Sequence, residues 1–156
     1  MKHLKVGDQA PEFTSTDHKD SKVSLGQFKG KKVVIYFYPK DNTPGCTAQA
    51  CNIRDNYELI QSKGIVIIGV SADSVDKHKS FIKKYDLPFI LLADTEKKLL
   101  NLYGVWGEKK FMGKIYDGIH RTTFILDEQH KIISIIDKPK TKEHSREILE
   151  AYEPLK

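Results

Sequence analysis

The chain has 156 residues, of which 39% are hydrophobic and 30% are charged, and its formal net charge is +5. This length and composition predict one globular domain over residues 1–156, with a single hydrophobic core. No stretch reaches the roughly 18 consecutive apolar residues of a membrane span, and the first residues hold no apolar segment like that of a secretory signal. We therefore expect a cytoplasmic protein that is not inserted in a membrane.

The positive charge comes from lysines that are scattered along the chain. A long basic stripe would indicate an anionic partner such as nucleic acid. Here the lysines occur in separate small groups, such as Lys83–Lys84 and Lys109–Lys110, which is typical of a solvated surface. We therefore expect no nucleic-acid partner.

Strands and helices are predicted in alternation. Residues 33–38 form an unbroken apolar run, as expected for a strand buried on both faces, and 65–70 form a second one. Helical spacing follows the first strand and ends at Lys63–Gly64, a cation before a glycine. In chain order we predict a strand at 33–38, a helix at 43–62, a strand at 65–70, a helix at 74–85, a strand at 89–93, a helix at 95–103, a loop over 104–120, strands at 121–126 and 131–136, and a helix at 143–152.

This order of elements indicates an α/β fold. The early strand–helix–strand unit predicts a parallel pair joined by a right-handed crossover. The late hairpin, which turns at 127–130, adds antiparallel strands. Together they predict a mixed central β-sheet flanked by helices on both faces, in the order of a thioredoxin-like fold.

The two cysteines of the chain, Cys46 and Cys51, stand five positions apart where the first predicted strand gives way to a helix. A thiol at a helix N-terminus faces the positive end of the helix dipole and unpaired backbone amides, both of which stabilise the thiolate. Cys51 is close enough in sequence to capture Cys46 once Cys46 is oxidised. In the cytosol, such pairs are more often catalytic or metal-binding than structural.

The residues before Cys46 define how the helix begins. Pro39 ends the strand, because it restricts its own backbone and that of the residue before it. Thr43 is a favourable helix N-cap, and Pro44 suits the first helical position. Cys46 then lies in the first turn, where backbone amides lack helical partners. The sequence therefore predicts a thiolate in an anion-binding pocket, with the Thr43 hydroxyl nearby.

The spacing P-x-x-x-T-x-x-C, formed by Pro39, Thr43 and Cys46, resembles the signature of the peroxiredoxins. The further C-x-x-x-x-C spacing is similar to the peroxiredoxin Q subfamily, also called bacterioferritin comigratory protein. The resemblance covers nearly the whole chain, including the segments Val6–Phe13, Tyr103–Lys109 and Gly118–Asp127.

The resemblance implies a thiol peroxidase that reduces hydrogen peroxide and organic hydroperoxides. Cys46 matches the peroxidatic nucleophile, which becomes a sulfenic acid, and Cys51 matches the resolving cysteine, which closes an intramolecular disulfide. Thioredoxin, or alternatively glutaredoxin, would restore both thiols by disulfide exchange. The resemblance implies no metal, flavin or haem cofactor, and a monomer.

The resemblance also assigns the residues that hold the peroxide. Arg121 matches the active-site arginine, which supports the thiolate and polarises the peroxide. Thr43 matches the residue whose hydroxyl holds the peroxide, and Pro39 matches the proline that shields the site. The backbone amides of Gly45 and Cys46 would complete the cradle. Arginine suits this role because it stays charged and presents several donors in one plane.

The helix geometry restricts how Cys46 and Cys51 can pair. On one continuous helix they are separated by ~7.5 Å of rise and ~140° of rotation, which places their Cα atoms ~8.7 Å apart. A disulfide needs Cα atoms within ~7 Å. We therefore predict that the helix around residues 46–51 unwinds locally before the disulfide forms.

The same residues also have simpler interpretations. Cys46 could be an inert core thiol, and Cys51 could serve packing alone, with an external thiol resolving the sulfenic acid. Arg121 could be an ordinary surface cation at a strand end. Gln49, one turn past Cys46, could hydrogen-bond within the site or face solvent.

Other functions are also considered. A thioredoxin-type oxidoreductase is disfavoured by the C-x-x-x-x-C spacing and by the absence of a proline before the Arg121 strand. A basic, redox-regulated binding or chaperone-like module would act without Cys46 chemistry. A zinc site is disfavoured because the histidines show no metal-ligand spacing with the two cysteines. These histidines are His78, His120, His130 and His144.

Overall fold

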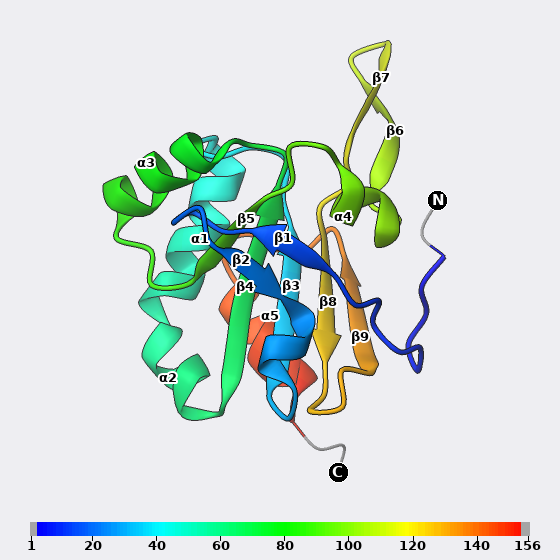
Figure 1. The fold of residues 1–156 in the computed structure, drawn as a ribbon. Helices are drawn as coiled ribbons and strands as arrows, with labels where there is room; N and C mark the ends of the chain where they lie inside the picture. Colours follow the sequence, from blue (N-terminus) through cyan, green and yellow to red (C-terminus); the bar gives the residue numbers. More distant parts are fainter. Residues whose placement is uncertain (1–2, 154–156) are drawn as a thin grey trace.

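The structure, a computed structural model, describes residues 3–153; the expected domain over 1–156 also includes 1–2 and 154–156, which lie outside the described residues. At its centre is a five-stranded sheet in the order β5-β4-β3-β8-β9 (Figure 1). Its strands are β3 (Lys32–Phe37), β4 (Ile65–Ser71), β5 (Ile90–Ala93), β8 (Thr122–Leu126) and β9 (Ile132–Asp137).

The sheet is mixed, as the sequence predicts. β3 pairs in parallel with β4, and β4 with β5, because a helix crosses over between each pair of strands. β8 pairs antiparallel with both β3 and β9, and a short turn joins it to β9. The predicted α/β, thioredoxin-like fold class is confirmed.

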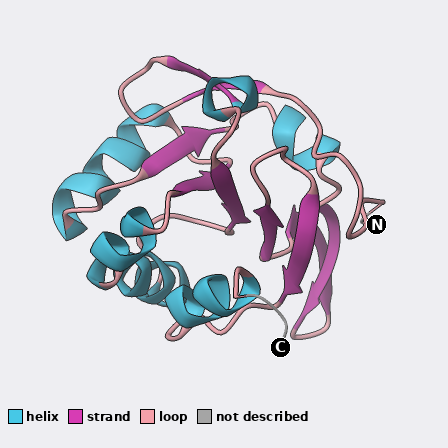
Figure 2. Cartoon of the chain, turned by 90° about the horizontal axis from the view of Figure 1, so that it is seen from below, coloured by secondary structure: helices cyan, strands magenta, loops and turns pink. Residues whose placement is uncertain are grey.

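Helices and loops cover both faces of the sheet (Figure 2). One face is covered by four helices, α1 (Pro44–Asp55), α2 (Tyr57–Ser62), α3 (Val75–Tyr85) and α5 (His144–Ala151). The other is covered by the N-terminal segment, which contains β1 (Thr14–Thr16), β2 (Lys22–Ser24) and the 3-10 helix η1 (Leu25–Phe28), and by α4 (Lys98–Leu102). No helix among residues 3–153 is long and apolar enough to cross a membrane.

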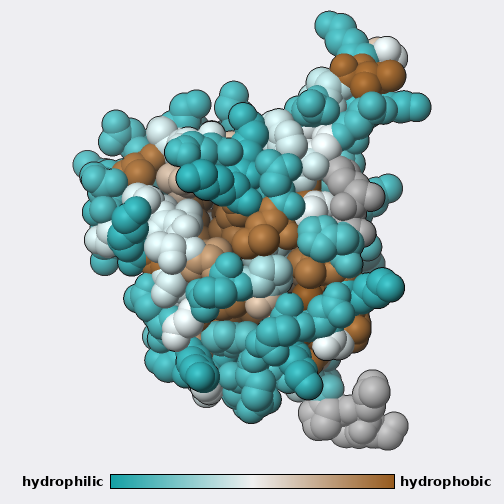
Figure 3. Space-filling model, turned by 45° about the vertical axis from the view of Figure 1, so that its right-hand side comes forward, coloured by the Kyte–Doolittle hydropathy of each residue, from teal (hydrophilic) through white to brown (hydrophobic). Residues whose placement is uncertain are grey.

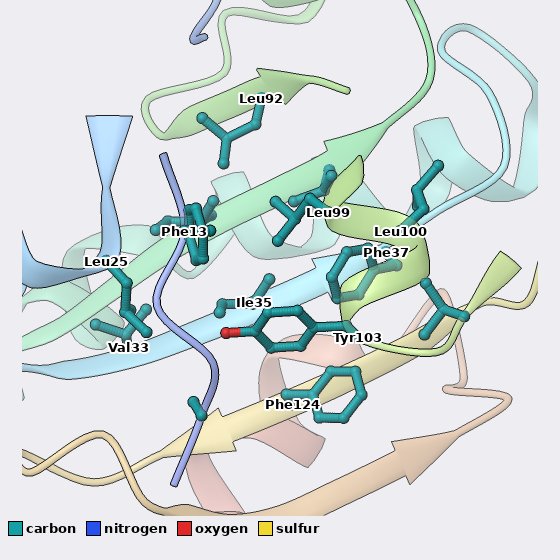
Figure 4. Packing of buried hydrophobic residues seen from close by; sticks show 14 of the residues in the cluster. Phe13, Leu25, Val33, Ile35, Phe37, Leu92, Leu99, Leu100, Tyr103 and Phe124 are labelled. Atoms are coloured by element: carbon teal, nitrogen blue, oxygen red, sulfur yellow. The ribbon is translucent and has the colours of Figure 1, made fainter. Parts of the chain in front are cut away.

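The central strand β3 supplies side chains to both cores because alternate residues point to opposite faces. Phe37 packs with Tyr103 and Phe124 on the face covered by α4, with ring centroids 5.2–5.8 Å apart (Figure 4). Tyr36 packs toward the helices on the other face and stacks on Tyr38. Full burial of each such ring contributes about 1.5–3 kcal/mol to folding, so β3 anchors the region that precedes α1.

Gly69 of β4 makes room for the ring of Tyr36. A Cβ atom at Gly69 would lie 2.8 Å from Tyr36 Cζ and 2.8 Å from Leu91 Cδ2. Neither buried atom has space to move, since interiors are close-packed. Glycine is therefore required here, because any side chain would clash with the Tyr36 ring and with Leu91.

The predicted single helix at 43–62 is two helices, α1 and α2, that meet at Asn56. Asn56 has φ −116° and ψ 13°, and its backbone N–H donates to Ile53 O, which tightens the last turn of α1. Its side-chain Nδ2 also donates to Asn52 O. Asparagine competes for backbone partners in this way, which explains a break that apolar spacing does not reveal.

The prediction of a loop over 104–120 is wrong. These residues contain a β-hairpin of β6 (Trp106–Phe111) and β7 (Lys114–Ile119), which projects from the body of the protein (Figure 1). Residues 111–117 are all exposed. The hairpin therefore lacks the apolar–polar alternation by which half-buried strands are recognised. The short strands β1 and β2 are also absent from the sequence prediction.

His144 at the start of α5 provides a test of this packing. Its Nε2 lies 2.8 Å from Thr123 Oγ1, and its Nδ1 lies 2.8 Å from Glu147 Oε1. Burial lowers the pKa of His144, and the hydrogen bond and charge of Glu147 offset that effect only in part. Below the ordinary pKa of about 6.5, the unfolded chain therefore binds a proton more readily than the folded chain.

We expect the stability of the protein to fall as the pH drops below about 6.5, and to fall less in His144→Gln, because glutamine does not titrate. The thermal midpoint, followed by circular dichroism, measures this at pH values above and below 6.5. An equal fall in the wild type and in His144→Gln would contradict the assignment.

Candidate active site

The site forms where β3 ends and α1 begins. The chain leaves β3 at Phe37 and reaches Thr43, which takes the predicted N-cap position with an extended backbone, followed by Pro44 at the first helical position. The Thr43 hydroxyl does not cap the helix; it donates to Lys40 O at 2.8 Å. The first helical hydrogen bond runs from Thr47 N to Thr43 O. The amides of the first turn precede this bond and have no helical carbonyl to donate to.

Arg121 lies against the thiol of Cys46. Arg121 Nη2 donates to Cys46 Sγ at 3.3 Å, and Cys46 is only 2% exposed. The sheet register explains this proximity: Thr122 of β8 pairs with Phe37 of β3, so the residue before β8 meets the loop that follows β3. Two residues that are 75 positions apart are thus brought together by one antiparallel pairing.

Gln49 holds the other side of the guanidinium. Its Oε1 accepts a hydrogen bond of 2.6 Å from Arg121 Nη1, and the side chain is fully buried. The sequence left open whether Gln49 faces the site or the solvent, and the structure places it in the site. Gly45 is also close, because a Cβ atom there would lie 3.3 Å from Arg121 Nη2. A larger residue at this position would crowd the arginine.

Lys109 is a second cation near the site, which the sequence interpretation did not assign. It comes from the β6–β7 hairpin, and its Nζ donates to Ile119 O at 2.9 Å. Burial lowers the pKa of Lys109, the charge of Arg121 lowers it further, and Cys46 acts in the opposite direction. Lys109 therefore interacts electrostatically with both Arg121 and Cys46. It lines an open pocket together with Arg121, His120, Thr122, Asp137 and Lys138.

Cys51 lies apart from this group. The buried face of α1 consists of Cys46, Gln49, Ala50 and Ile53, which recur at helical spacing, whereas Cys51 is half-buried beside that face. Both thiols are free. Because α1 is continuous from Pro44 to Asp55, the ideal-helix separation of ~8.7 Å between the two Cα atoms applies. The helix as it stands does not permit the disulfide.

A buried hydrogen-bond network holds the loop between β3 and α1. Asp41 accepts from the Tyr38 hydroxyl at 2.6 Å and contacts His78 Nδ1 at 2.6 Å, while its backbone N–H donates to Asp73 at 2.7 Å. His78 Nε2 lies 2.8 Å from Leu92 O, and a carbonyl can only accept, so Nε2 carries a proton. His78 therefore ties the loop to both α3 and β5.

The side chains of Asp41, Asp73 and His78 lie within 4.8 Å of one another, a spacing that a metal site would also show. Hydrogen bonds within the protein already engage these groups: both oxygens of Asp41, both nitrogens of His78, and one oxygen of Asp73, which accepts from Ser71 at 2.8 Å. This arrangement is typical of a structural network that fixes a loop.

Of the sequence-predicted site residues, the structure brings Cys46 and Arg121 into contact and places Gly45 close to the guanidinium of Arg121. Thr43 stands one turn before Cys46 on the same loop-to-helix junction, and Pro39 lies half-buried in the loop. Gln49 and Lys109 also belong to the site. The sequence leaves the position of Gln49 open and assigns no role to Lys109. What the arrangement provides is a buried thiol that faces a fixed cation and unpaired helix amides, which is suited to a reactive thiolate.

A buried cysteine at a helix N-terminus on a thioredoxin-like sheet, beside an arginine from the start of a neighbouring strand, indicates the class of thiol-dependent peroxidases. Residues 6–135 match the AhpC/TSA family. The chain belongs to the AhpC/TSA family, and its relatives place it in the Bcp/PrxQ group of peroxiredoxins.

The comparisons with known proteins agree with one another. The chain is 45% identical over 149 residues to peroxiredoxin Bcp of Escherichia coli, covering 96% of both proteins. It is 45% identical over 147 residues to peroxiredoxin Bcp of Bacillus subtilis, covering 94% of both. Among solved structures, a PrxQ mutant of Xylella fastidiosa superposes with a TM-score of 0.89 at 28% identity, covering 96% of both chains. The predicted membership of the peroxiredoxin Q subfamily is confirmed.

The loop network can be tested by substitution at His78. In His78→Leu the carboxylate of Asp41 stays buried and its Oδ2 atom loses its contact with His78 Nδ1, so we expect the free energy of unfolding to fall by about 3–5 kcal/mol. Urea denaturation measures the loss, and the exposed neighbour Lys79→Leu is the matched control, with a change within about 0.5 kcal/mol. A loss below about 1 kcal/mol in His78→Leu would show that the network is not important for stability.

Proposed function

We propose that Cys46 reduces hydroperoxides by direct attack on the peroxide oxygen. The Cys46 thiolate forms a bond to the terminal oxygen, the O–O bond breaks, and the other oxygen leaves and takes a proton to become water or an alcohol. Cys46 is oxidised to a sulfenic acid and the peroxide is reduced. The observation that carries this proposal is the 3.3 Å contact between Arg121 and the buried Sγ.

The surrounding groups suit the charge that develops in this step. Negative charge moves from sulfur to the leaving oxygen, and the guanidinium of Arg121 and the amides of Gly45 and Cys46 are donors fixed around that path. Because the Thr43 hydroxyl already donates to Lys40 O, it can accept a hydrogen bond from the peroxide. We propose that Pro39, half-buried in the loop, shields the thiolate from water.

In the second step Cys51 resolves the sulfenic acid. The Cys51 thiolate attacks the sulfur of Cys46, an S–S bond forms, and the S–O bond breaks with the oxygen leaving as water. This step requires α1 to unwind between the two cysteines. Unwinding that extends to Asn52 also frees the start of α5, because Asn52 Oδ1 accepts from Ser145 N at 2.7 Å. The disulfide is then carried on a loosened segment that a reductant can reach.

We propose thioredoxin as the reductant, with glutaredoxin as the alternative, and a monomer as the working form. Both thiols come from one chain, so a partner subunit is not needed for the disulfide. A solved structure at 30% identity is described by its title as bearing on the alkyl peroxide reduction activity of the Xanthomonas campestris bacterioferritin comigratory protein. That activity supports organic hydroperoxides as substrates here. The cytosol stays the predicted compartment.

A coupled assay with thioredoxin, thioredoxin reductase and NADPH tests the cycle. We expect Cys46→Ser to abolish peroxide consumption, because serine is a far weaker nucleophile. We expect Cys51→Ser to consume about one peroxide per chain without supporting NADPH oxidation, since no disulfide forms for thioredoxin to reduce. Ala48→Ser, on the same helix, is the control and keeps full turnover.

Two results would overturn the proposal. The first is a wild type that oxidises no NADPH with either hydrogen peroxide or an organic hydroperoxide, with thioredoxin or with glutaredoxin. The second concerns the unwinding step: amide hydrogen exchange over 46–51 should be faster in the oxidised than in the reduced protein, and unchanged exchange would contradict a local opening.

A further inference from the structure

The end of the β6–β7 hairpin carries an unusual concentration of exposed apolar side chains. Phe111 is 65% exposed, Met112 86%, Ile115 62% and Tyr116 47%. These four stand within six consecutive positions, whereas the other exposed large hydrophobic residues of the described chain are scattered. In Figure 3 hydrophobic atoms gather near the outer end of the projecting hairpin. Single exposed apolar residues need no explanation, but a cluster of this kind indicates an interaction site.

The turn itself is built around an apolar residue that folding does not favour. Met112 and Gly113 form the two-residue turn, and both have positive φ, 52° and 80°. The first position of such a turn favours asparagine or aspartate, whose short polar side chains tolerate the left-handed backbone. The left-handed backbone of Met112 is unfavourable for its side chain. Because that side chain is 86% exposed, packing within the protein compensates for little of this cost. Its side chain is therefore better explained by something it contacts outside the chain.

Positive charge surrounds these apolar residues. From Lys109 to Tyr116, both included, the hairpin holds three lysines and no acidic residue. The two acidic residues of the hairpin, Glu108 and Asp117, pair with each other further from the turn. The outer end of the hairpin thus combines apolar side chains with the ammonium groups of Lys110 and Lys114, both of which are exposed.

The narrow shape of the hairpin end favours a lipid surface over a protein partner. A stable protein interface buries about 800 Å² on each partner and involves about 20–30 residues a side. A two-residue turn with its flanking positions is too narrow and convex to supply this surface. A lipid interface asks for no such area, because apolar side chains enter between the headgroups while lysines pair with anionic lipids. Aromatic and methionine side chains beside lysines suit that boundary.

We propose that the outer end of the β6–β7 hairpin, residues 110–116, docks on an anionic lipid surface. Phe111, Met112 and Ile115 enter the headgroup region, and Lys110 and Lys114 contact the lipid phosphates. The hairpin is six residues long on each strand, so docking holds its base about 20 Å from the lipid. Arg121 follows that base by two residues, so docking fixes the Cys46 site on the molecule's side of this spacer rather than in contact with the lipid. Docking does not depend on the peroxidase chemistry.

Sedimentation with vesicles tests this proposal, using phosphatidylcholine mixed with phosphatidylglycerol, and phosphatidylcholine alone. We expect the wild type to sediment with the anionic vesicles only, and less so at high salt. Phe111→Thr/Met112→Asn should weaken binding at least about tenfold, and asparagine also suits the turn, so the fold is retained. Lys110→Gln/Lys114→Gln should weaken binding about tenfold.

The control is Leu59→Gln, which removes a half-exposed apolar side chain on α2, far from the hairpin in the sequence; it should bind like the wild type. Sedimentation velocity without lipid tests the alternative that the hairpin binds a second copy of the chain. The proposal is overturned if the wild type binds neither vesicle, if Phe111→Thr/Met112→Asn binds as well as the wild type, or if these substitutions change only the oligomeric state. Hydrogen peroxide turnover, measured in parallel, should be unchanged in every hairpin variant, which separates docking from the chemistry.

Discussion

The contact between Arg121 and Cys46 is the interaction on which the site depends. It exists because β8 runs antiparallel to β3, so that the start of β8 lies beside the end of β3, where the helix carrying Cys46 begins. In the proposed reaction, a cation held there stabilises the negative charge that moves to the departing oxygen. The fold therefore places one fixed charge beside the sulfur atom at which the proposed reaction begins.

The surrounding structure keeps both partners in place. Gln49 occupies the second edge of the guanidinium, and the buried contacts of Asp41 with His78 hold the loop from which α1 starts. Cys51, in contrast, lies outside the buried face of α1 and is half-exposed. The proposed nucleophile, Cys46, thus lies on the buried face of α1, while Cys51, which must move in the proposed reaction, lies on a less buried side of the helix.

Much of this could be predicted from the sequence, for identifiable reasons. Unbroken apolar runs predict the buried strands. The spacing of Pro39, Thr43 and Cys46 predicts where the helix begins. The features that the sequence analysis missed depend on contacts between distant residues, on side-chain hydrogen bonds or on solvent exposure. The β6–β7 hairpin has no buried face and so no alternation, and the break at Asn56 arises from side-chain hydrogen bonds. Gln49 could be placed in the site only once α1 was set against β8.

The most direct test is the second-order rate of Cys46 oxidation by hydrogen peroxide, measured by stopped flow in Gln49→Ala, Arg121→Lys and the double variant. A hydrogen bond to a charged group contributes about 1.5–3 kcal/mol, or roughly ten- to hundredfold in rate. The proposed role of Arg121 predicts a loss of that size in each single variant, and almost no further loss from Gln49→Ala in the Arg121→Lys background, because Gln49 acts through Arg121. Equal losses from Gln49→Ala in both backgrounds, or a full rate in Arg121→Lys, would contradict it.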